Sequence, residues 1–214
     1  KTFKDESILE KNVGPVYENK KRCRALENAI QNKIDIAILD DGFQDFSINK
    51  NLSILCFNEK QLIGNGFTIP SGPLRENLIS LKRADCVIIN GNKNKDIENK
   101  IFNENRKIKI FYTSYKAKNI NEFQNKKIVA FAGIGNPENF FDLLKNNKLN
   151  VIETIKFPDH YKYSKKDLES LLNKIKGNNF FLTTTEKDFF RIPEKYKENI
   201  KYLKIEVEIQ NKNQ

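Results

Sequence analysis

Apolar and polar positions along the first half of the chain separate into short apolar runs and one amphipathic stretch. Arg22–Gln31 places its apolar residues on one side of a helix. The apolar runs predict strands at Ile34–Leu39, Leu52–Phe57, Cys86–Ile89 and Ile108–Tyr112. Between the second and third of these strands lie a glycine- and proline-rich loop, residues 64–73, and a helix beginning near Arg75. A polar connector, residues 92–107, precedes the fourth strand.

After Ser114 the alternation starts again. Strands are predicted at Lys127–Ala132, Val151–Phe157, Phe180–Thr184 and Lys201–Glu208, with helices at Glu138–Lys145 and Ser164–Ile175. Alternating strands and helices are typical of an α/β fold with a mostly parallel sheet. The break near residues 116–124 predicts a boundary between a first domain, 1–115, and a smaller second one, 116–214.

Two carboxylates, Asp40 and Asp41, directly follow the run Ile34–Leu39, which we expect to be a buried strand. Gly42 lets the backbone turn behind them. In open α/β sheets ligands collect at the carboxyl ends of strands, where acidic residues can hold Mg²⁺ beside a nucleotide phosphate. An ordinary Asp-Gly turn explains the same residues, and the spacing alone does not decide between the two.

The loop from Gly64 to Glu76 ends in Arg75 and Glu76, at the expected start of a helix. An arginine there can bind phosphate in a bidentate way, and a glutamate can complete a metal site. Alternatively, Glu76 only stabilises the helix N-terminus and Arg75 lies on the surface. For this motif alone, the structural interpretation is favoured.

His160, in the segment Phe157–Tyr161, is the only histidine. Histidine suits proton transfer near neutral pH, and a carboxylate partner, either Asp159 or a distant aspartate, can orient it. Taken alone, such a histidine is more often an ordinary surface residue.

Two further turns give weaker signals. Gly133–Pro137, between a strand and a helix, would expose backbone N–H groups to an anion, but it lacks the third glycine of a dinucleotide fingerprint. In Thr183–Asp188, a threonine capping a short helix with Asp188 in its first turn is at least as good an explanation as a direct role.

Composition narrows the setting. No apolar stretch approaches the roughly 20 residues that span a bilayer, and nothing resembles a signal peptide. Cys56 and Cys86 lie in strand-like runs, which predicts buried free thiols and a reducing cytoplasm. The net charge of +10 comes from scattered lysines and does not choose among nucleic acid, an anionic membrane and a phosphorylated substrate as the binding partner.

The chain has no methionine and no P-loop motif, so we expect it to be part of a longer protein whose phosphate-binding loop lies upstream of Lys1.

Five ordered motifs resemble the tetraacyldisaccharide 4'-kinase family, the lipid A 4'-kinases of Gram-negative bacteria. They are Leu39–Gln44, the loop Gly64–Glu76, Phe131–Pro137, Phe157–His160 and Thr184–Asp188. The resemblance implies a P-loop NTPase-like α/β fold, with a mostly parallel sheet covered by helices on both faces, plus a smaller C-terminal α/β domain. It also implies ATP and Mg²⁺ as cofactors. The reaction would transfer the γ-phosphate to the 4'-hydroxyl of tetraacyldisaccharide 1-phosphate, a step of lipopolysaccharide synthesis. The setting would be the cytoplasmic face of the inner membrane, with no nucleic-acid partner.

The resemblance also implies roles for residues. Asp5, the first acid of an Asp-Glu pair, would be the catalytic base, and His160 would orient it and raise its basicity. Asp40 and Asp41 would be the Walker-B-type acids that bind nucleotide and metal, Glu76 would help to hold Mg²⁺, and Arg75 would bind phosphate.

Two positions depart from the family pattern: Asp45 stands where the family usually has histidine, and Asn77 where it usually has proline. Two alternatives stay open. One is a non-catalytic remnant that binds nucleotide or an anionic surface, since a chain without a P-loop is expected to bind ATP poorly. The other, ranked last, is a nucleic-acid-binding protein, which the charge alone suggests.

Overall fold

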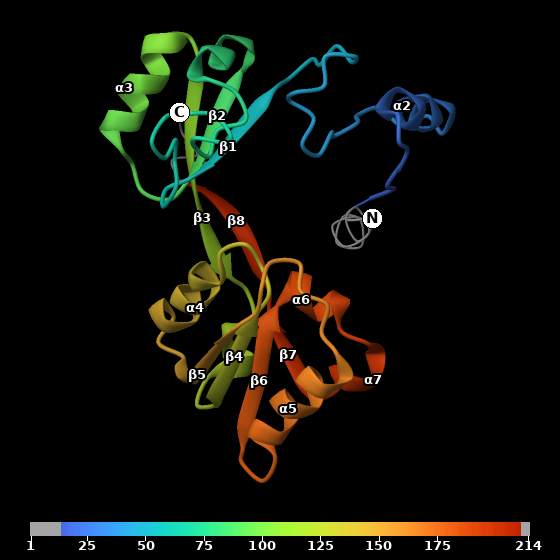
Figure 1. Cartoon of the computed structure of the whole chain (residues 1–214), viewed down its shortest axis with the longest axis vertical. Coiled ribbons are helices and arrows are strands. Elements are labelled where there is room, and N and C mark those ends of the chain that lie inside the picture. Colours follow the sequence, from blue (N-terminus) through green and yellow to red (C-terminus); the bar gives the residue numbers. More distant parts are fainter. Residues whose placement is uncertain (1–13, 211–214) are drawn as a thin grey trace. The chain divides into compact units, whose positions relative to one another are not determined.

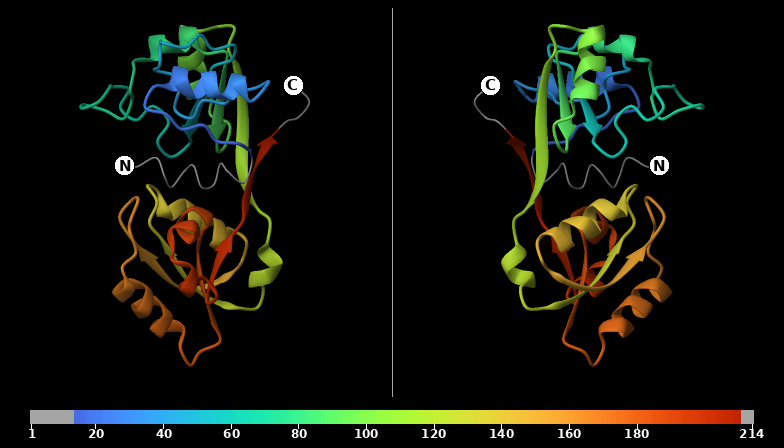
Figure 2. Two further views of the ribbon diagram at one scale, coloured as in Figure 1. Left: turned by 90° about the vertical axis from the view of Figure 1, so that its right-hand side faces the viewer. Right: turned by 90° about the vertical axis from the view of Figure 1, so that its left-hand side faces the viewer.

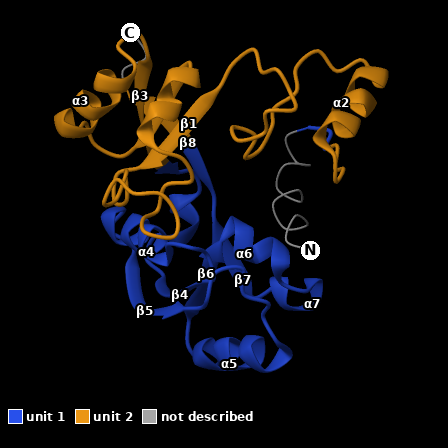
Figure 3. Ribbon diagram, turned by 45° about the horizontal axis from the view of Figure 1, so that its top comes forward, with its two compact units in different colours: residues 1–16, 116–206 blue, residues 17–115, 207–214 orange. Residues whose placement is uncertain are grey.

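The computed structural model describes residues 14–210. Figure 1 shows its helices and strands. Contacts divide this part of the chain into two units, shown in Figure 3. Unit 2 comprises residues 17–115 and 207–210, and unit 1 comprises residues 14–16 and 116–206. Among the helices of residues 14–210, none is both long and apolar enough to cross a lipid bilayer.

Unit 2 is built on a four-stranded sheet with the order β1-β2-β3-β8. Its strands are β1 (Ile54–Asn58), β2 (Cys86–Asn90), β3 (Lys109–Ala117) and β8 (Ile205–Gln210), of which β3 ends and β8 begins in residues assigned to unit 1. β2 pairs in parallel with β1 on one side and β3 on the other, so that Cys86 lies opposite both Ile54 and Lys109. Val87 and Ile89 are fully buried, as alternation along a strand with one covered face requires.

The covered face of this sheet packs against α3 (Lys95–Glu104) and the 3₁₀ helix η1 (Leu78–Arg83). Asn94 caps α3 by accepting hydrogen bonds from the backbone N–H groups of Asp96 and Ile97. Ile97 and Ile101, one turn apart, are its buried residues. The predicted polar connector therefore contains a helix, because two isoleucines at helical spacing are enough to dock it.

Helix α2 (Arg22–Gln31) has the predicted bounds, but of its apolar side only Ala29 is buried and Ile30 is 71% exposed. The buried strand predicted at Ile34–Leu39 is wrong. These residues are irregular, and Ile36 and Ile38 are 80% and 93% exposed. A buried strand needs neighbours that take up its backbone hydrogen bonds and cover its side chains. No strand of residues 14–210 pairs with this segment.

Unit 1 holds a second four-stranded sheet, with the order β5-β4-β6-β7. Its strands, all paired in parallel, are β5 (Asn150–Lys156), β4 (Lys127–Ala132), β6 (Phe180–Thr185) and β7 (Ile200–Leu203). Its helices are η2 (Ile120–Phe123), α4 (Pro137–Asn146), α5 (Lys165–Ile175), α6 (Glu186–Arg191) and α7 (Glu194–Lys197).

Central strand β4 is buried on both faces. Ile128, Ala130 and Ala132 join a cluster with Phe141 and Leu144 of α4. Val129 and Phe131 join a second cluster on the opposite face, which includes Leu168 and Leu171 of α5. Helices thus cover both faces of this sheet, as Figure 2 also shows. The prediction of an α/β fold with mostly parallel sheets is confirmed.

Several details differ from the predictions. Cys56 is exposed and Cys86 half-buried, so the two cysteines are free but not buried, because the core that residues 14–210 form in unit 2 lies on the other face of its sheet. The single strand predicted at Lys201–Glu208 is two, β7 and β8. The helix expected near Arg75 begins at Leu78 as a 3₁₀ helix, so Arg75 and Glu76 precede it.

Candidate functional site

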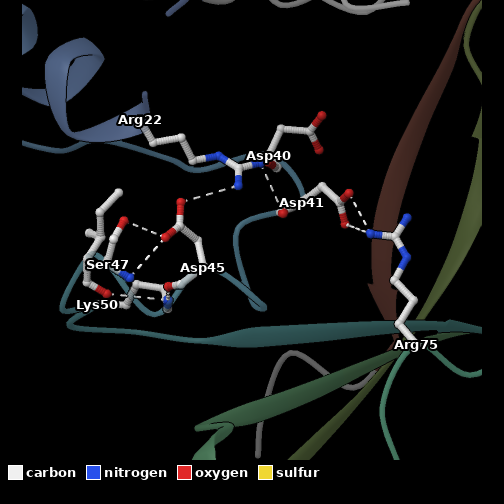
Figure 4. Close-up of polar contacts among 8 residues, drawn as sticks. Arg22, Asp40, Asp41, Asp45, Ser47, Lys50 and Arg75 are labelled. Carbon is white, nitrogen blue, oxygen red and sulfur yellow. Dashed lines mark hydrogen bonds and ion pairs between the residues drawn. The ribbon is translucent and has the colours of Figure 1, made fainter. Parts of the chain in front are cut away.

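Asp40 and Asp41 lie in a turn that Arg22 holds from the first position of α2. Nη2 of Arg22 donates to the backbone carbonyl oxygens of Asp40 at 3.0 Å and of Asp41 at 3.1 Å. Its Nη1 lies 3.5 Å from a carboxylate oxygen of Asp45 (Figure 4). A Cβ on Gly42 would lie 2.7 Å from Cβ of Leu39, so the turn accepts only glycine there. One arginine therefore fixes the backbone of both candidate acids and leaves their carboxylates outward.

Asp41 is paired with Arg75. Its backbone adopts a left-handed conformation, φ 51°, which is uncommon for a residue other than glycine. Nη1 of Arg75 lies 2.5 Å from both carboxylate oxygens (Figure 4). This hydrogen bond and the negative charge of Asp41 raise the pKa of Arg75 above its ordinary value. Both side chains are 56% exposed, so the pair is open to an incoming ligand.

An open pocket of about 450 Å³ lies beside this pair. It is lined by Arg22, Asp41, Gln44, Asp45, Phe46 and Arg75. Two arginines face two aspartates across it, so the pocket offers cationic groups for an anion and carboxylates for a cation.

Asp45 stiffens the wall of this pocket. Its carboxylate accepts hydrogen bonds from the side chain and the backbone N–H of Ser47, at 2.5 and 2.9 Å. These two bonds hold the pKa of Asp45 below its usual range, and Arg22 adds to the effect. Lys50 donates to the backbone carbonyl of Asp45. Asp45 thus stabilises the conformation of the segment up to Lys50 that follows the Asp-Asp-Gly turn.

Glu76 faces Arg83. Oε2 of Glu76 accepts a hydrogen bond of 2.6 Å from Nη2 of Arg83. The guanidinium of Arg83 lies over the rings of Phe43 and Phe46, 4.7 and 4.6 Å from their centroids. Arg83 therefore connects the loop that ends at Glu76 with the aromatic residues that follow the Asp-Asp-Gly turn.

The donor set of unit 2 suits Mg²⁺. Mg²⁺ in nucleotide sites binds through one or two carboxylates, with phosphates and water completing its shell. Asp40 and Asp41 offer adjacent exposed carboxylates, and Oε1 of Glu76 is buried without a hydrogen-bond partner. Within residues 14–210 no three acidic, histidine or cysteine side chains gather at the spacing of a complete metal site. The residues fit a metal that shares its ligands with a phosphate.

In unit 1, His160 sits on a segment fixed by aromatic packing. The rings of Phe157, Tyr161 and Tyr163 pack on one another, with centroids 4.8 to 5.4 Å apart. Phe131 of β4 meets Tyr163 edge-on at 5.5 Å. Tyr161 also donates to Asp167 at 3.1 Å, and Asp167 forms the capping box of α5 with Ser164. A turn between a strand and a helix is thereby made rigid.

Gly133 is the contact point between this segment and α6. Its carbonyl accepts from the backbone N–H of His160 and from Nη1 of Arg191, both at 3.1 Å. Its N–H donates to Asp188 at 3.0 Å. The sequence suggested that this N–H could bind an anion, but it is already used. A Cβ there would lie 2.9 Å from the hydroxyl of Tyr163. The predicted cap of α6 is confirmed: the Thr185 hydroxyl accepts from the Asp188 N–H.

The structure brings together some of the predicted site residues. Asp41 and Arg75 line one pocket, and Asp40 precedes Asp41 in the same turn, whereas Glu76 faces Arg83 and His160 belongs to unit 1. Asp5 lies outside the described residues. Sequence reasoning missed three arginines, Arg22, Arg83 and Arg191. The spacing of Asp188 and Arg191, three residues apart beside a capping threonine, was the signal available for the last.

Comparison with known proteins decides the family. A sequence model described as tetraacyldisaccharide-1-P 4'-kinase, LpxK, matches residues 3–214. The chain belongs to the tetraacyldisaccharide 4'-kinase family. Among its relatives, the tetraacyldisaccharide 4'-kinase of Pelagibacter ubique (strain HTCC1062) is 42% identical over 208 residues, 96% of this chain. That of Rickettsia bellii (strain OSU 85-389) is 39% identical over 189 residues, 88% of this chain.

A solved LpxK structure shares the fold. The crystal structure of the "apo" form of LpxK from Aquifex aeolicus in complex with ATP superposes with a TM-score of 0.63 at 26% identity, over 87% of this chain. The α/β kinase class expected from the resemblance is thus confirmed. The chain spans 66% of the Pelagibacter ubique kinase, 58% of the Rickettsia bellii kinase and 57% of the Aquifex aeolicus chain.

Proposed function

We propose that the protein is an ATP-dependent kinase that phosphorylates the 4'-hydroxyl of tetraacyldisaccharide 1-phosphate in lipid A synthesis. The observation that carries the proposal is the Asp40–Asp41 turn, with Arg75 and an open pocket beside it, in a chain of this family. The relatives bear the name of this activity, and the Aquifex aeolicus structure contains ATP.

Arg75 is the phosphate-binding group in this proposal. Its planar fork fits phosphate oxygens as well as the carboxylate that it now contacts. A nucleotide phosphate in the pocket would draw Arg75 from Asp41 and free that carboxylate. Arg22, which donates to two backbone carbonyls, would keep the turn in place during this exchange.

Asp40, Asp41 and Glu76 are the proposed holders of Mg²⁺. When bound with nucleotide, the ion supplies charge neutralisation for the transferred phosphoryl group. Arg83 positions Glu76 for this role through its hydrogen bond and its stacking on Phe43 and Phe46.

Asp5 and His160 are the proposed catalytic pair. Asp5 would accept the proton of the attacking 4'-hydroxyl, and His160 would orient its carboxylate. We further propose that the protein acts as a peripheral protein on the cytoplasmic face of the inner membrane, where its lipid substrate lies, and has no nucleic-acid partner.

The test is transfer of γ-³²P from ATP to tetraacyldisaccharide 1-phosphate in the presence of Mg²⁺. It uses the product of the complete reading frame, because the relatives are longer than this chain. Labelled lipid supports the kinase. A folded protein that binds ATP without labelling the lipid would instead favour the second candidate, a non-catalytic nucleotide-binding member of the family.

A further inference from the structure

The side chains of Arg191 and His160 lie within hydrogen-bond distance of one another in unit 1, and the chemistry of the guanidinium decides which of them is the donor. Nη2 of Arg191 lies 3.1 Å from Nδ1 of His160. A guanidinium has five N–H donors and no acceptor. Nδ1 must therefore accept, which requires that it carries no proton. In a neutral imidazole the proton is then on Nε2.

Arg191 is itself held from several sides. Its Nη1 donates to the carbonyl of Gly133 at 3.1 Å and lies 3.5 Å from the carboxylate of Asp188. The side chains of Arg191 and Asp188 are only 6% and 0% exposed. Asp188 in turn accepts from the N–H of Gly133 at 3.0 Å and from the hydroxyl of Thr185 at 2.8 Å. A buried ion pair with this many hydrogen bonds is costly to displace, so Arg191 is a rigid partner.

The other ring nitrogen of His160 is on the accessible side. The side chain is 34% exposed, and Nε2 lies 3.8 Å from Oδ2 of Asp159, beyond hydrogen-bond distance. The backbone of His160 is in the left-handed region, φ 55°, and its N–H donates to Gly133. The same N–H also donates to a carboxylate oxygen of Asp159 at 2.9 Å. The backbone N–H and Nδ1 of His160 thus both have partners, which leaves the Nε2–H group for a further acceptor.

We propose that Arg191 is a positioning residue for His160, holding its ring in the Nε2–H tautomer so that it acts as a hydrogen-bond donor to a carboxylate. The inference deepens the proposed function, on which its catalytic consequence rests. A donor at Nε2 orients one carboxylate oxygen and leaves the other free to accept the proton of a substrate hydroxyl. His160 then works by orientation and does not itself remove the proton.

Nitrogen NMR of the 214-residue chain tests the tautomer without any assay of activity. His160 is its only histidine, so ¹⁵N-histidine labelling gives one imidazole. At about pH 8.5, where an ordinary imidazole is neutral, we expect Nδ1 to resonate as an unprotonated nitrogen and Nε2 as a protonated one. The Nδ1–H tautomer in the folded wild type would overturn the proposal, whatever any variant does.

Variants then ask whether Arg191 causes the tautomer. Arg191→Met removes the donor and should give a mixture of the two tautomers, whereas Arg191→Lys, which keeps a donor, should retain more of the Nε2–H form. Lys165→Met, exposed at the start of α5 in the same unit, is the matched control and should change nothing. An Arg191→Met protein that folds and keeps the wild-type nitrogen shifts contradicts the proposal.

The catalytic consequence has a separate readout in the product of the complete reading frame. Arg191→Met should lower kcat about 10- to 100-fold, as misplacement of a catalytic group does, with little change in the KM for ATP. Partial recovery in Arg191→Lys supports positioning, and an unchanged kcat in Arg191→Met overturns it. If the wild type has no kinase activity but the NMR result holds, the proposed function fails and the structural role of Arg191 stands.

Discussion

Arg75 and Asp41 form a two-oxygen contact, with Nη1 of the arginine 2.5 Å from each carboxylate oxygen. Each residue is proposed to serve a different part of a nucleotide, Arg75 its phosphate and Asp41 its metal ion. In the structure the charge of each side chain is paired with that of the other. A ligand that brings both a phosphate and a cation replaces the contact with two new ones, whereas either alone would leave one charge unpaired.

Arg75→Met should raise the KM for ATP about tenfold, the value of one charge-assisted hydrogen bond to phosphate. Arg75→Lys should recover only part of the loss, because a lysine lacks the planar fork. Steady-state kinetics at varied ATP measure both. The control is Arg106→Met, an exposed arginine of unit 2 outside the pocket. A KM for ATP that is the same in Arg75→Met as in the control contradicts the phosphate role.

Arg22→Met should lower kcat about 10-fold or more through loss of order in the Asp40–Asp41 turn. The substitution removes the two hydrogen bonds that Arg22 donates to the backbone carbonyls of this turn. The free energy of unfolding should fall by only about 1 kcal/mol, since these bonds are exposed. Kinetics and urea unfolding of the same protein separate the two effects. A loss of stability without a loss of kcat would make Arg22 a structural residue only.

Gly133→Ala should destabilise the protein by about 1–3 kcal/mol, because the added Cβ would lie 2.9 Å from the Tyr163 hydroxyl and 3.3 Å from Asp188. Urea unfolding measures the change. Gly14→Ala, where a Cβ meets nothing within 4 Å, is the control and should change stability little. Equal stability of the two variants would show that the packing around Gly133 is looser than described.

The free energy of unfolding should fall as the pH rises above about 10, where tyrosine ionises in the unfolded chain. Burial, together with the charge of Asp188, raises the pKa of Tyr163. The folded state therefore keeps a proton that the unfolded state loses, and stability is full below that pH and decreases above it by up to about 1.4 kcal/mol per pH unit.

Urea unfolding between pH 8 and 11 tests this pH dependence. At the upper end of this pH range, the free energy of unfolding of Tyr163→Phe should decrease less steeply than that of the wild type. That of Tyr115→Phe, at a position 44% exposed, should follow the wild type. Parallel curves for wild type and Tyr163→Phe would contradict the assignment to Tyr163.

The alternation of apolar runs predicted the second half of the chain well. Lys127–Ala132 has the bounds of β4, and Ser164, the first residue of the predicted helix Ser164–Ile175, is the N-cap of α5. These elements form from local signals, a strand that is apolar after its first residue or a capping residue. Ile34–Leu39 has an equally apolar composition but is irregular in the structure. Strand formation there depends on neighbours, which a local pattern does not contain.

The candidate site shows the same limit. Asp41 and Arg75 were both expected to act on a nucleotide, but their contact with one another joins residues 34 apart and no spacing rule predicts it. His160 was identified as the only histidine, yet its partner Arg191 lies 31 residues away and is brought close by the order of strands β4 and β6. Contacts between residues far apart in the chain depend on the topology of the fold and cannot be predicted from local sequence patterns.

The central claim is that Asp41 and His160 serve one phosphoryl transfer. The most direct measurement is the rate of ³²P transfer from ATP to tetraacyldisaccharide 1-phosphate by the product of the complete reading frame, compared with Asp41→Asn and His160→Ala. The account predicts a fall of at least about 100-fold in each variant, with the folded state retained. Transfer at the wild-type rate in either variant would contradict it.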